Sequence, residues 1–232
     1  MHWRDLKVST QPGPKPRKIV DETWSANLAY AIGLLATDGC MSRYTNLIDL
    51  TSKDKEQLKN FSKCLGLNLF IGKKYNGRGQ MSFRVQFKNV IFYEFLLRIG
   101  LTPAKSKTLG ALKIPKRYFF DFLRGVFDGD GSTYSYWDKR WKASFMFYLG
   151  FASASRTFVD WIRENIRYRL GVHGHVTTAG YSGSCYNLKY AKGDSLKILR
   201  RMYHSPNSIR LRRKYLKIQR MLAIVGESIG KT

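Results

Sequence analysis

Apolar residues recur with a helical period in several segments, beginning with residues 24–37. This segment combines small and large apolar side chains without proline, so we expect a helix that stops at an Asp-Gly turn. Residues 53–65 predict a second, amphipathic helix, because their apolar side chains fall on one stripe. Thr51 and Asp54 are expected to form a capping box at its start, and Gly66 to cap its end.

Strict alternation replaces the helical period in residues 80–88, where apolar and polar side chains take turns. A period of two predicts a half-buried strand whose exposed face carries Arg84, Gln86 and Lys88. We also expect a hairpin over 40–52, a strand over 69–75 and a helix over 89–99.

The same order of elements recurs about 92 residues further along the chain. A helix over 118–127 is expected to end at the sequence DGDG, and two strand pairs with helices follow it. The expected strands lie at 132–137, 142–153, 174–180 and 185–191, and the expected helices at 156–170, 194–203 and 208–225. The pattern helix-strand-strand-helix-strand-strand-helix therefore occurs twice, which predicts an α+β fold made by internal duplication.

The duplication sets the expected domain boundaries. Residues 1–20 are rich in proline and basic side chains and are expected to form a flexible arm. The first repeat is placed at 21–112, with a linker from about 101, and the second repeat with the last helix at 113–232.

The net charge of the chain indicates the kind of partner that it binds. The chain has 41 Lys and Arg against 16 Asp and Glu, a net charge of +25. Such an excess repels itself in a compact protein, so an anionic partner is expected, and nucleic acid is the leading candidate because neutralised phosphates release counterions. A membrane surface is the alternative. The sequence has no apolar run of spanning length and no signal-peptide core at its start, so we expect an intracellular protein without a membrane partner.

The ends of the two apolar helices can be aligned. AIGLLATDG at 31–39 lies over LRGVFDGDG at 123–131. Gly33 then matches Gly125, and Asp38 matches Asp130. An Asp-Gly pair at a strand entry is also an ordinary turn. A turn alone does not explain why both copies put a carboxylate at the negative end of a helix dipole, an unfavourable place that invites a cation.

Asp128 has no acidic counterpart, because Ala36 lies opposite it. A calcium-binding EF-hand loop that starts at Asp128 would need glycine at its sixth position and glutamate at its twelfth. Thr133 and Lys139 occupy those positions, which excludes this kind of site. Asp128 is therefore given a supporting role.

Small residues indicate how the two matched acids could meet. Ala29 and Gly33 lie one helical turn apart, and Gly33 and Gly125 have no side chains, so two helices could cross with their backbones in contact. Such a crossing would bring Asp38 and Asp130 side by side. Paired carboxylates of this kind suit metal-assisted hydrolysis of phosphodiesters.

These two segments resemble the paired motifs of the LAGLIDADG homing endonucleases in their single-chain, two-repeat form, over roughly residues 22–222. The resemblance implies a pseudo-twofold protein in which two antiparallel four-stranded sheets form a saddle over DNA, with the motif helices at the central interface. It also implies that Asp38 and Asp130 coordinate Mg²⁺, joined by the backbone carbonyls of Thr37 and Gly129. Mn²⁺ or Ca²⁺ is expected to substitute for Mg²⁺ in binding. Ala36 departs from the family pattern at a position that is not an essential ligand.

The resemblance further implies basic residues near the metals. By their position after each second strand pair, the matching candidates are Lys105 in the first half and Arg212 or Arg213 in the second. Ser52 and Ser153 are weaker candidates. A plain phosphate contact is the alternative role for each basic residue.

The family's sheets lie in the major groove, so polar side chains on the strands and their turns become candidate DNA contacts. Their alternative is the wet face of an antiparallel sheet. The candidates are Arg43, Lys73, Tyr75, Arg78, Arg84, Gln86, Lys88, Tyr134, Tyr136, Lys139, Arg140, Lys142, Asn187 and Lys189.

The sequence therefore predicts a monomeric, Mg²⁺-dependent homing endonuclease (meganuclease) that makes a double-strand break in a long asymmetric duplex target. One alternative keeps the fold but not this chemistry, as an RNA maturase that binds intron RNA or as a non-cleaving DNA-binding regulator. A basic structural coat for nucleic acid is the other. It explains the charge but not the paired acids.

Overall fold

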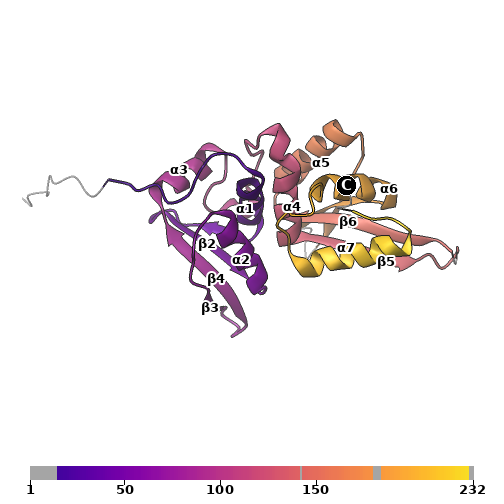
Figure 1. Cartoon of the computed structure of the whole chain (residues 1–232), viewed down its shortest axis with the longest axis horizontal. Helices are drawn as coiled ribbons and strands as arrows, with labels where there is room; N and C mark the ends of the chain where they lie inside the picture. Colours follow the sequence, from indigo (N-terminus) through magenta and orange to yellow (C-terminus); the bar gives the residue numbers. More distant parts are fainter. Residues whose placement is uncertain (1–14, 142, 180–183, 230–232) are drawn as a thin grey trace, which may run out of the picture.

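A computed structural model describes residues 15–141, 143–179 and 184–229 of the chain. Two halves lie side by side, and α1 and α4 meet between them (Figure 1). The first half contains α1 (Ala26–Thr37), β1 (Gly39–Met41), β2 (Leu47–Ser52), α2 (Lys55–Cys64), β3 (Gly72–Tyr75), β4 (Met81–Lys88) and α3 (Val90–Arg98). The link contains the short 3-10 helices η1 (Lys105–Lys107) and η2 (Lys116–Tyr118). The second half contains α4 (Phe119–Asp130), β5 (Gly131–Trp137), β6 (Phe145–Ser153), α5 (Arg156–Leu170), β7 (His175–Ala179), β8 (Cys185–Tyr190), α6 (Lys192–Met202) and α7 (Arg212–Ile224).

The strand order confirms the expected α+β fold with two antiparallel four-stranded sheets. The first sheet has the order β1-β2-β4-β3, and the second has the equivalent order β5-β6-β8-β7. One face of each sheet packs against helices through alternate apolar residues, such as Ile48 and Leu50 in β2 and Phe147 and Leu149 in β6. We call the opposite face of each sheet its open face.

The helix boundaries follow local capping. Ser25 and Ser155 accept hydrogen bonds from Leu28 N and Phe158 N, and these bonds begin α1 and α5. The expected capping box at α2 is wrong in one residue. Asp54 alone caps this helix, whereas the Thr51 hydroxyl donates to Asp49 Oδ1, 2.8 Å away, because both side chains lie on one face of β2.

α4 also ends later than expected. The helix continues through Asp128 and Gly129 to Asp130, whereas the sequence predicted that it would stop before DGDG. Asp-Gly pairs are turn signals, but buried packing of the whole segment against α1 overrides this local preference.

The crossing of α1 and α4 depends on two glycines. A Cβ on Gly33 would lie 2.8 Å from Gly125 Cα and overlap the carbonyl oxygen of Phe122. A Cβ on Gly125 would lie 3.0 Å from Gly33 Cα and overlap the carbonyl oxygen of Tyr30. The two backbones are therefore in direct contact, as the small residues predicted, and Ala29 is fully buried beside them.

The chain between α6 and α7 is held by a buried arginine. Arg124 is 1% exposed and donates to the carbonyls of Met202 and Ile209 and to Asp121. Its carboxylate partner and the backbone carbonyls satisfy a charge that would otherwise be costly to bury. The contact with Ile209 anchors the chain just before α7. No helix in the described residues has both the length and the apolar character that a membrane span needs.

Candidate active site

The crossing places both motif acids at neighbouring helix ends. Asp38 is the C-cap of α1, and Asp130 is the last residue of α4. A Cβ on Gly129 would lie 3.2 Å from Asp38 Oδ2, so the Asp38 carboxylate reaches across to the end of the other helix. The Gln57 amide, from α2, donates to Asp38 Oδ2 at 2.6 Å and fixes its orientation.

The negative charge of Asp38 acts on Asp130. Burial raises the pKa of Asp38. The pKa of Asp130 is raised to about 6. The larger cause is partial desolvation of its carboxyl group by the surrounding protein, and the second is the negative charge of Asp38. Asp130 as a whole still faces solvent, so a substrate could reach it. A site in which two acids repel each other favours a bound cation, because its charge relieves the repulsion.

Two lysines stand beside the acids. Lys105, from η1, is 6% exposed, and its ammonium donates to the carbonyl of Gly39. Lys214, from α7, donates to the carbonyls of Phe127 at 2.7 Å, Gly129 at 2.9 Å and Gly131 at 2.7 Å. Gly39 and Gly131 are matched positions of the two repeats, so Lys105 and Lys214 are equivalent across the pseudo-twofold.

Burial lowers the pKa of both ammonium groups. It lowers the pKa of Lys105, and it lowers the pKa of Lys214 to about 8, while the negative charges of nearby acids act in the opposite direction. Asp38 and Asp130 are among those acids for both lysines. The site therefore combines two carboxylates with two cations, one pair from each half.

The oxygen atoms around Asp38 and Asp130 form a donor set that suits Mg²⁺. Two carboxylates with adjacent backbone carbonyls provide only oxygen, the donor that hard cations prefer. Within the described ranges no group of three or more His, Cys, Asp or Glu side chains could hold a metal. Mg²⁺ commonly takes one or two carboxylates and completes its shell with water and substrate phosphate, so the pair fits this ion.

The carbonyl candidates lie at the same crossing. Thr37 is the last residue of α1, and a Cβ on Gly129 would overlap the Thr37 hydroxyl. The Gly129 carbonyl already accepts from Lys214. A carbonyl oxygen has two lone pairs, so this bond leaves one position for a cation.

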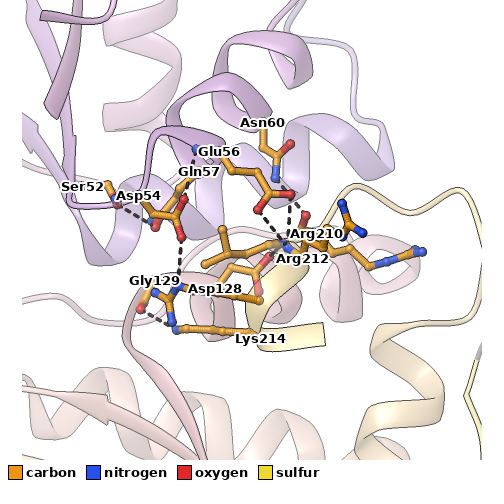
Figure 2. Close-up of polar contacts among 12 residues, drawn as sticks. Ser52, Asp54, Glu56, Gln57, Asn60, Asp128, Gly129, Arg210, Arg212 and Lys214 are labelled. Atoms are coloured by element: carbon orange, nitrogen blue, oxygen red, sulfur yellow. Dashed lines mark hydrogen bonds and ion pairs between the residues drawn. The ribbon is translucent and has the colours of Figure 1, made fainter. Parts of the chain in front are cut away.

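The two predicted arginines lie elsewhere. Arg213 Nε donates to Asp54 Oδ2 at 2.8 Å on the surface, and the backbone N–H of Arg212 faces the Glu56 carboxylate at 3.2 Å. Figure 2 shows Lys214 reaching the Gly129 end of α4 while Arg212 lies against Glu56 and points away. The structure brings Lys105 to the acids, together with Lys214, but not Arg212 or Arg213.

The weaker candidates and Asp128 act through neighbours. Ser52 Oγ donates to Gln57 Oε1 at 3.0 Å and so supports the amide that holds Asp38, whereas Ser153 Oγ accepts from Ser155 N. Asp128 is fully buried, and its Oδ2 accepts from Tyr30 Oη and Leu211 N, both at 2.7 Å. It ties α1 to the start of α7 and does not face the paired acids' solvent side.

Strand register divides the candidate contacts of the first sheet. Arg84 pairs with Thr51 and Gly72, and Gln86 pairs with Asp49, so these side chains share the open face. Lys88 is exposed on the same face. Lys73 and Tyr75 pair with Phe83 and Met81 and therefore point to the other face, while Lys74 takes the place expected for Lys73.

The second sheet presents four candidates on its open face, namely Tyr134, Tyr136, Asn187 and Lys189. Most of the remaining candidate DNA contacts lie in turns. Arg43, Arg78 and Lys139 are exposed, and the Arg140 guanidinium pairs with Asp138 at 3.0 Å. Lys142 lies outside the described residues, as does the arm up to residue 14.

Neither a family model nor a curated protein matches this sequence. Solved structures do match. The homing endonuclease I-WcaI bound to its DNA recognition sequence is 12% identical over 84% of this chain and 88% of that chain, with a TM-score of 0.56. I-DmoI in complex with DNA and Ca is 14% identical over 83% of this chain and 97% of that chain, with a TM-score of 0.54. The N-terminal LAGLIDADG domain of DUF199/WhiA is 13% identical over 84% of this chain and 88% of that chain, with a TM-score of 0.51.

Proposed function

We propose that this chain, which has the LAGLIDADG fold, is a site-specific endonuclease that cuts both strands of duplex DNA with Mg²⁺. One observation carries the proposal. Asp38 and Asp130, one from each half, meet at the end of the α1–α4 crossing closely enough for the charge of Asp38 to raise the pKa of Asp130. Because one chain supplies both acids, we infer that it acts as a monomer.

Asp38 and Asp130 would hold the metal, with the carbonyls of Thr37 and Gly129 beside them. The chemistry that bound Mg²⁺ supplies is a lowered pKa for an attacking water and neutralisation of the charge that develops on phosphate. Gln57 keeps the Asp38 carboxylate in one orientation through its 2.6 Å hydrogen bond. The Ser52 hydroxyl holds Gln57 in turn.

Lys105 and Lys214 would act on the phosphate. Each ammonium is anchored on backbone carbonyls of the strand entry, Gly39 in one half and Gly131 in the other. A cation fixed in this way can stabilise developing charge on phosphate through space. For Lys214 this effect is Coulombic, because its three N–H groups already donate to carbonyls. The pKa of Lys214, lowered to about 8 by burial, also leaves it able to exchange a proton near neutral pH.

The fold alone does not carry this function. Solved structures with the same fold include the homing endonucleases and the domain of DUF199/WhiA. The acids carry it, because a protein that only binds DNA has no need of two repelling carboxylates at the point where its halves meet. The open faces of the two sheets, with Arg84, Gln86 and Lys189, would contact the duplex.

The test is cleavage of a plasmid library carrying random duplex inserts, in the presence of Mg²⁺. We expect the wild-type chain to linearise a small subset of plasmids. Asp38→Asn and Asp130→Asn should each lower double-strand cleavage by about a thousandfold, because each removes a charged oxygen ligand. Asp160→Asn is the matched control, since Asp160 is a partly exposed carboxylate of α5 that pairs with Arg156 and Arg163.

Two results would contradict the proposal. The first is undiminished double-strand cutting by either acid variant. The second is equal loss in the Asp160→Asn control, which would indicate a general effect of charge and not a metal site. Binding of the enriched duplexes by each variant should persist, and its measurement separates lost chemistry from lost folding.

A further inference from the structure

The two sheets match in strand order, but their open faces differ in chemistry. In the first sheet, Asp49, Thr51, Lys74, Arg84 and Gln86 share the open face through the register of β2, β3 and β4. In the second sheet, Gly150 and Ala152 stand at the positions of Asp49 and Thr51, while Asn187 and Lys189 keep polar groups at those of Arg84 and Gln86. Tyrosines on β5 and β6 cover the part of the face beside them. Duplication alone would give two similar open faces, so the two repeats of this chain have diverged at these positions.

The first open face is a fixed array of charged and amide groups. Gln86 Nε2 donates to Asp49 Oδ2 at 2.8 Å, and Lys74 Nζ donates to Thr51 Oγ1 at 3.0 Å. Asp49 is only 7% exposed because these partners surround it. Such an array presents donors and acceptors at set positions, as is needed to contact the N7, O6 and N6 groups of purines.

The second open face is a tyrosine groove, which we define by Tyr134, Tyr136 and Tyr148. Tyr134 lies directly opposite Tyr148, and Tyr136 opposite Met146. The ring centroids of Tyr134 and Tyr136 are 5.5 Å apart, and those of Tyr136 and Tyr148 are 6.3 Å apart with an angle of 10° between their planes. Among the described residues that line this groove, Lys189 is the basic one.

The groove is hollow because of a glycine. Its volume is about 360 Å³, and Ser132 and Gly150 complete its lining. A Cβ on Gly150 would lie 3.3 Å from Ser132 Oγ, so a larger residue would press on Ser132 and fill the floor. The result is an apolar depression in the middle of a surface that otherwise faces solvent.

We propose that the tyrosine groove reads the 5-methyl groups of thymine in one half of the target, while the first sheet reads its half through hydrogen bonds and charge. This inference rests on the proposed function. In the major groove the thymine methyl is the apolar group that base edges present, and apolar side chains recognise it by contact. The tyrosines and Met146, with Asn187 and Lys189 beside them, offer apolar contact area over most of this face.

A duplex suits this groove better than unpaired bases. Single-stranded nucleic acid is recognised by stacking of bases on open aromatic faces. Tyr136 and Tyr148 lie nearly parallel to each other, so each covers part of the ring surface that a stacked base would use. Tyr134, 64% exposed, is the ring most open to contact from outside.

The first step of the test orients the target. Duplexes would be selected from a random pool by the full-length wild-type chain, by Arg84→Ala and by Tyr134→Ala, with Ca²⁺ in place of Mg²⁺ to limit cutting. We expect Arg84→Ala to relax base preference in one half of the selected site and Tyr134→Ala in the other half. The half affected by Tyr134→Ala is then the half that faces the second sheet.

The second step removes methyl groups alone. Deoxyuridine replaces thymine in one half of the selected duplex at a time, which keeps the base pair but deletes the 5-methyl group. In the half that faces the second sheet, we expect about a fourfold loss of affinity for each contacted methyl, and in the other half less than twofold. Tyr134→Phe should keep this discrimination, since the ring remains, and Tyr134→Ala should lose it. Tyr168→Ala, at an exposed tyrosine on α5, is the matched control and should behave as wild type.

The outcomes separate this inference from the proposed function. A selected duplex whose affinity is unchanged by deoxyuridine in either half, or lowered equally in both, overturns the reading of thymine and leaves the endonuclease proposal in place. The same holds if Tyr134→Ala keeps the discrimination. Failure to select any duplex, or tighter tyrosine-dependent binding to single-stranded RNA than to duplex DNA, overturns both.

Discussion

Lys214 is the residue whose change should best distinguish chemistry from binding. Its ammonium bonds three carbonyls at the end of α4 and lies near both acids. We expect Lys214→Met to slow cleavage by about a hundredfold, because a preorganised cation at the phosphate is lost, while affinity changes little. Single-turnover cleavage and equilibrium binding measure the two effects.

Arg213→Met provides the matched control for this prediction. Arg213 is a neighbouring basic residue, and it pairs with Asp54 on the surface instead of the acids. Its removal should change single-turnover cleavage by less than about threefold. Equal losses in the two variants, with no partial rescue in Lys214→Arg, would show that Lys214 has no special part in the reaction.

Asp128 should matter for stability. Its Oδ2 accepts two buried hydrogen bonds, from Tyr30 Oη and Leu211 N. Asp128→Ala leaves both donors without a partner, so we expect a loss of about 2–5 kcal/mol in the free energy of unfolding. Asp128→Asn keeps an acceptor and should lose less than half of that. Urea unfolding measures both, and a Tyr30→Phe/Asp128→Asn cycle would isolate the bond between them; an Asp128→Ala protein as stable as wild type contradicts this role.

At the residue scale, the sequence predicted which acidic residues meet at the α1–α4 crossing better than it predicted which basic residues lie near them. Asp38 and Asp130 could be found because alignment of two helix ends fixes each position to the residue. Lys214 could not, because it follows Arg212 and Arg213 within one helical turn, and only the docking of α7 decides which of three basic residues turns inward. The sequence signal available was the match of Gly39 with Gly131, because Lys105 donates to the carbonyl of the first and Lys214 to that of the second.

The α1–α4 crossing is the element on which the site depends. Gly33→Ala or Gly125→Ala would place a methyl group against backbone atoms, which cannot move aside as a side chain can. We expect each variant to lose about 3 kcal/mol or more of unfolding free energy, and to lose cleavage as the acids separate. Thermal and urea unfolding measure the first effect.

A third glycine gives the control for this element. Gly193 lies in α6, and a Cβ there would meet no atom within 4 Å. Gly193→Ala should therefore raise the free energy of unfolding by about 0.5–1 kcal/mol, since alanine favours a helix. A crossing variant that behaves like Gly193→Ala would show that the helices can separate without cost, against the contact described above.

The sequence predicted the helices and strands more securely than it predicted which side chains of each strand lie on the open face. The strict alternation of residues 80–88 gave β4 and its open face, including Arg84 and Gln86. The strand Gly72–Tyr75 has two adjacent lysines and no alternation, so its sequence cannot say which of them shares that face. A shift of one residue reverses every side chain, and only pairing with β4 shows that Lys74 and not Lys73 shares the face of Arg84.

At the scale of the whole molecule, charge and symmetry give different information. The net charge of +25 was read directly from composition and predicts an anionic partner without any knowledge of the fold. The duplication predicted two equivalent halves. It could not by itself predict that their open faces differ, because the strand register is the same in both sheets and the difference comes from the residue types at matched positions, such as Asp49 and Gly150. Under the proposed function, charge would set how strongly the chain binds nucleic acid, and the two faces would set which sequence it prefers.

That division can be tested through the salt dependence of duplex binding. Each phosphate neutralised by a lysine or arginine releases counterions, so the logarithm of affinity should fall linearly with the logarithm of salt concentration. For a site that spans both sheets we expect a slope steeper than about −5, and Lys88→Gln should reduce its magnitude by about one if Lys88 meets a phosphate. Tyr134→Ala should lower affinity with the slope unchanged, because it removes contact area and no charge. Titrations at several salt concentrations on one selected duplex measure all three; a flat slope for the wild-type chain would contradict a nucleic-acid partner, and a changed slope in Tyr134→Ala would contradict the separation of charge from base reading.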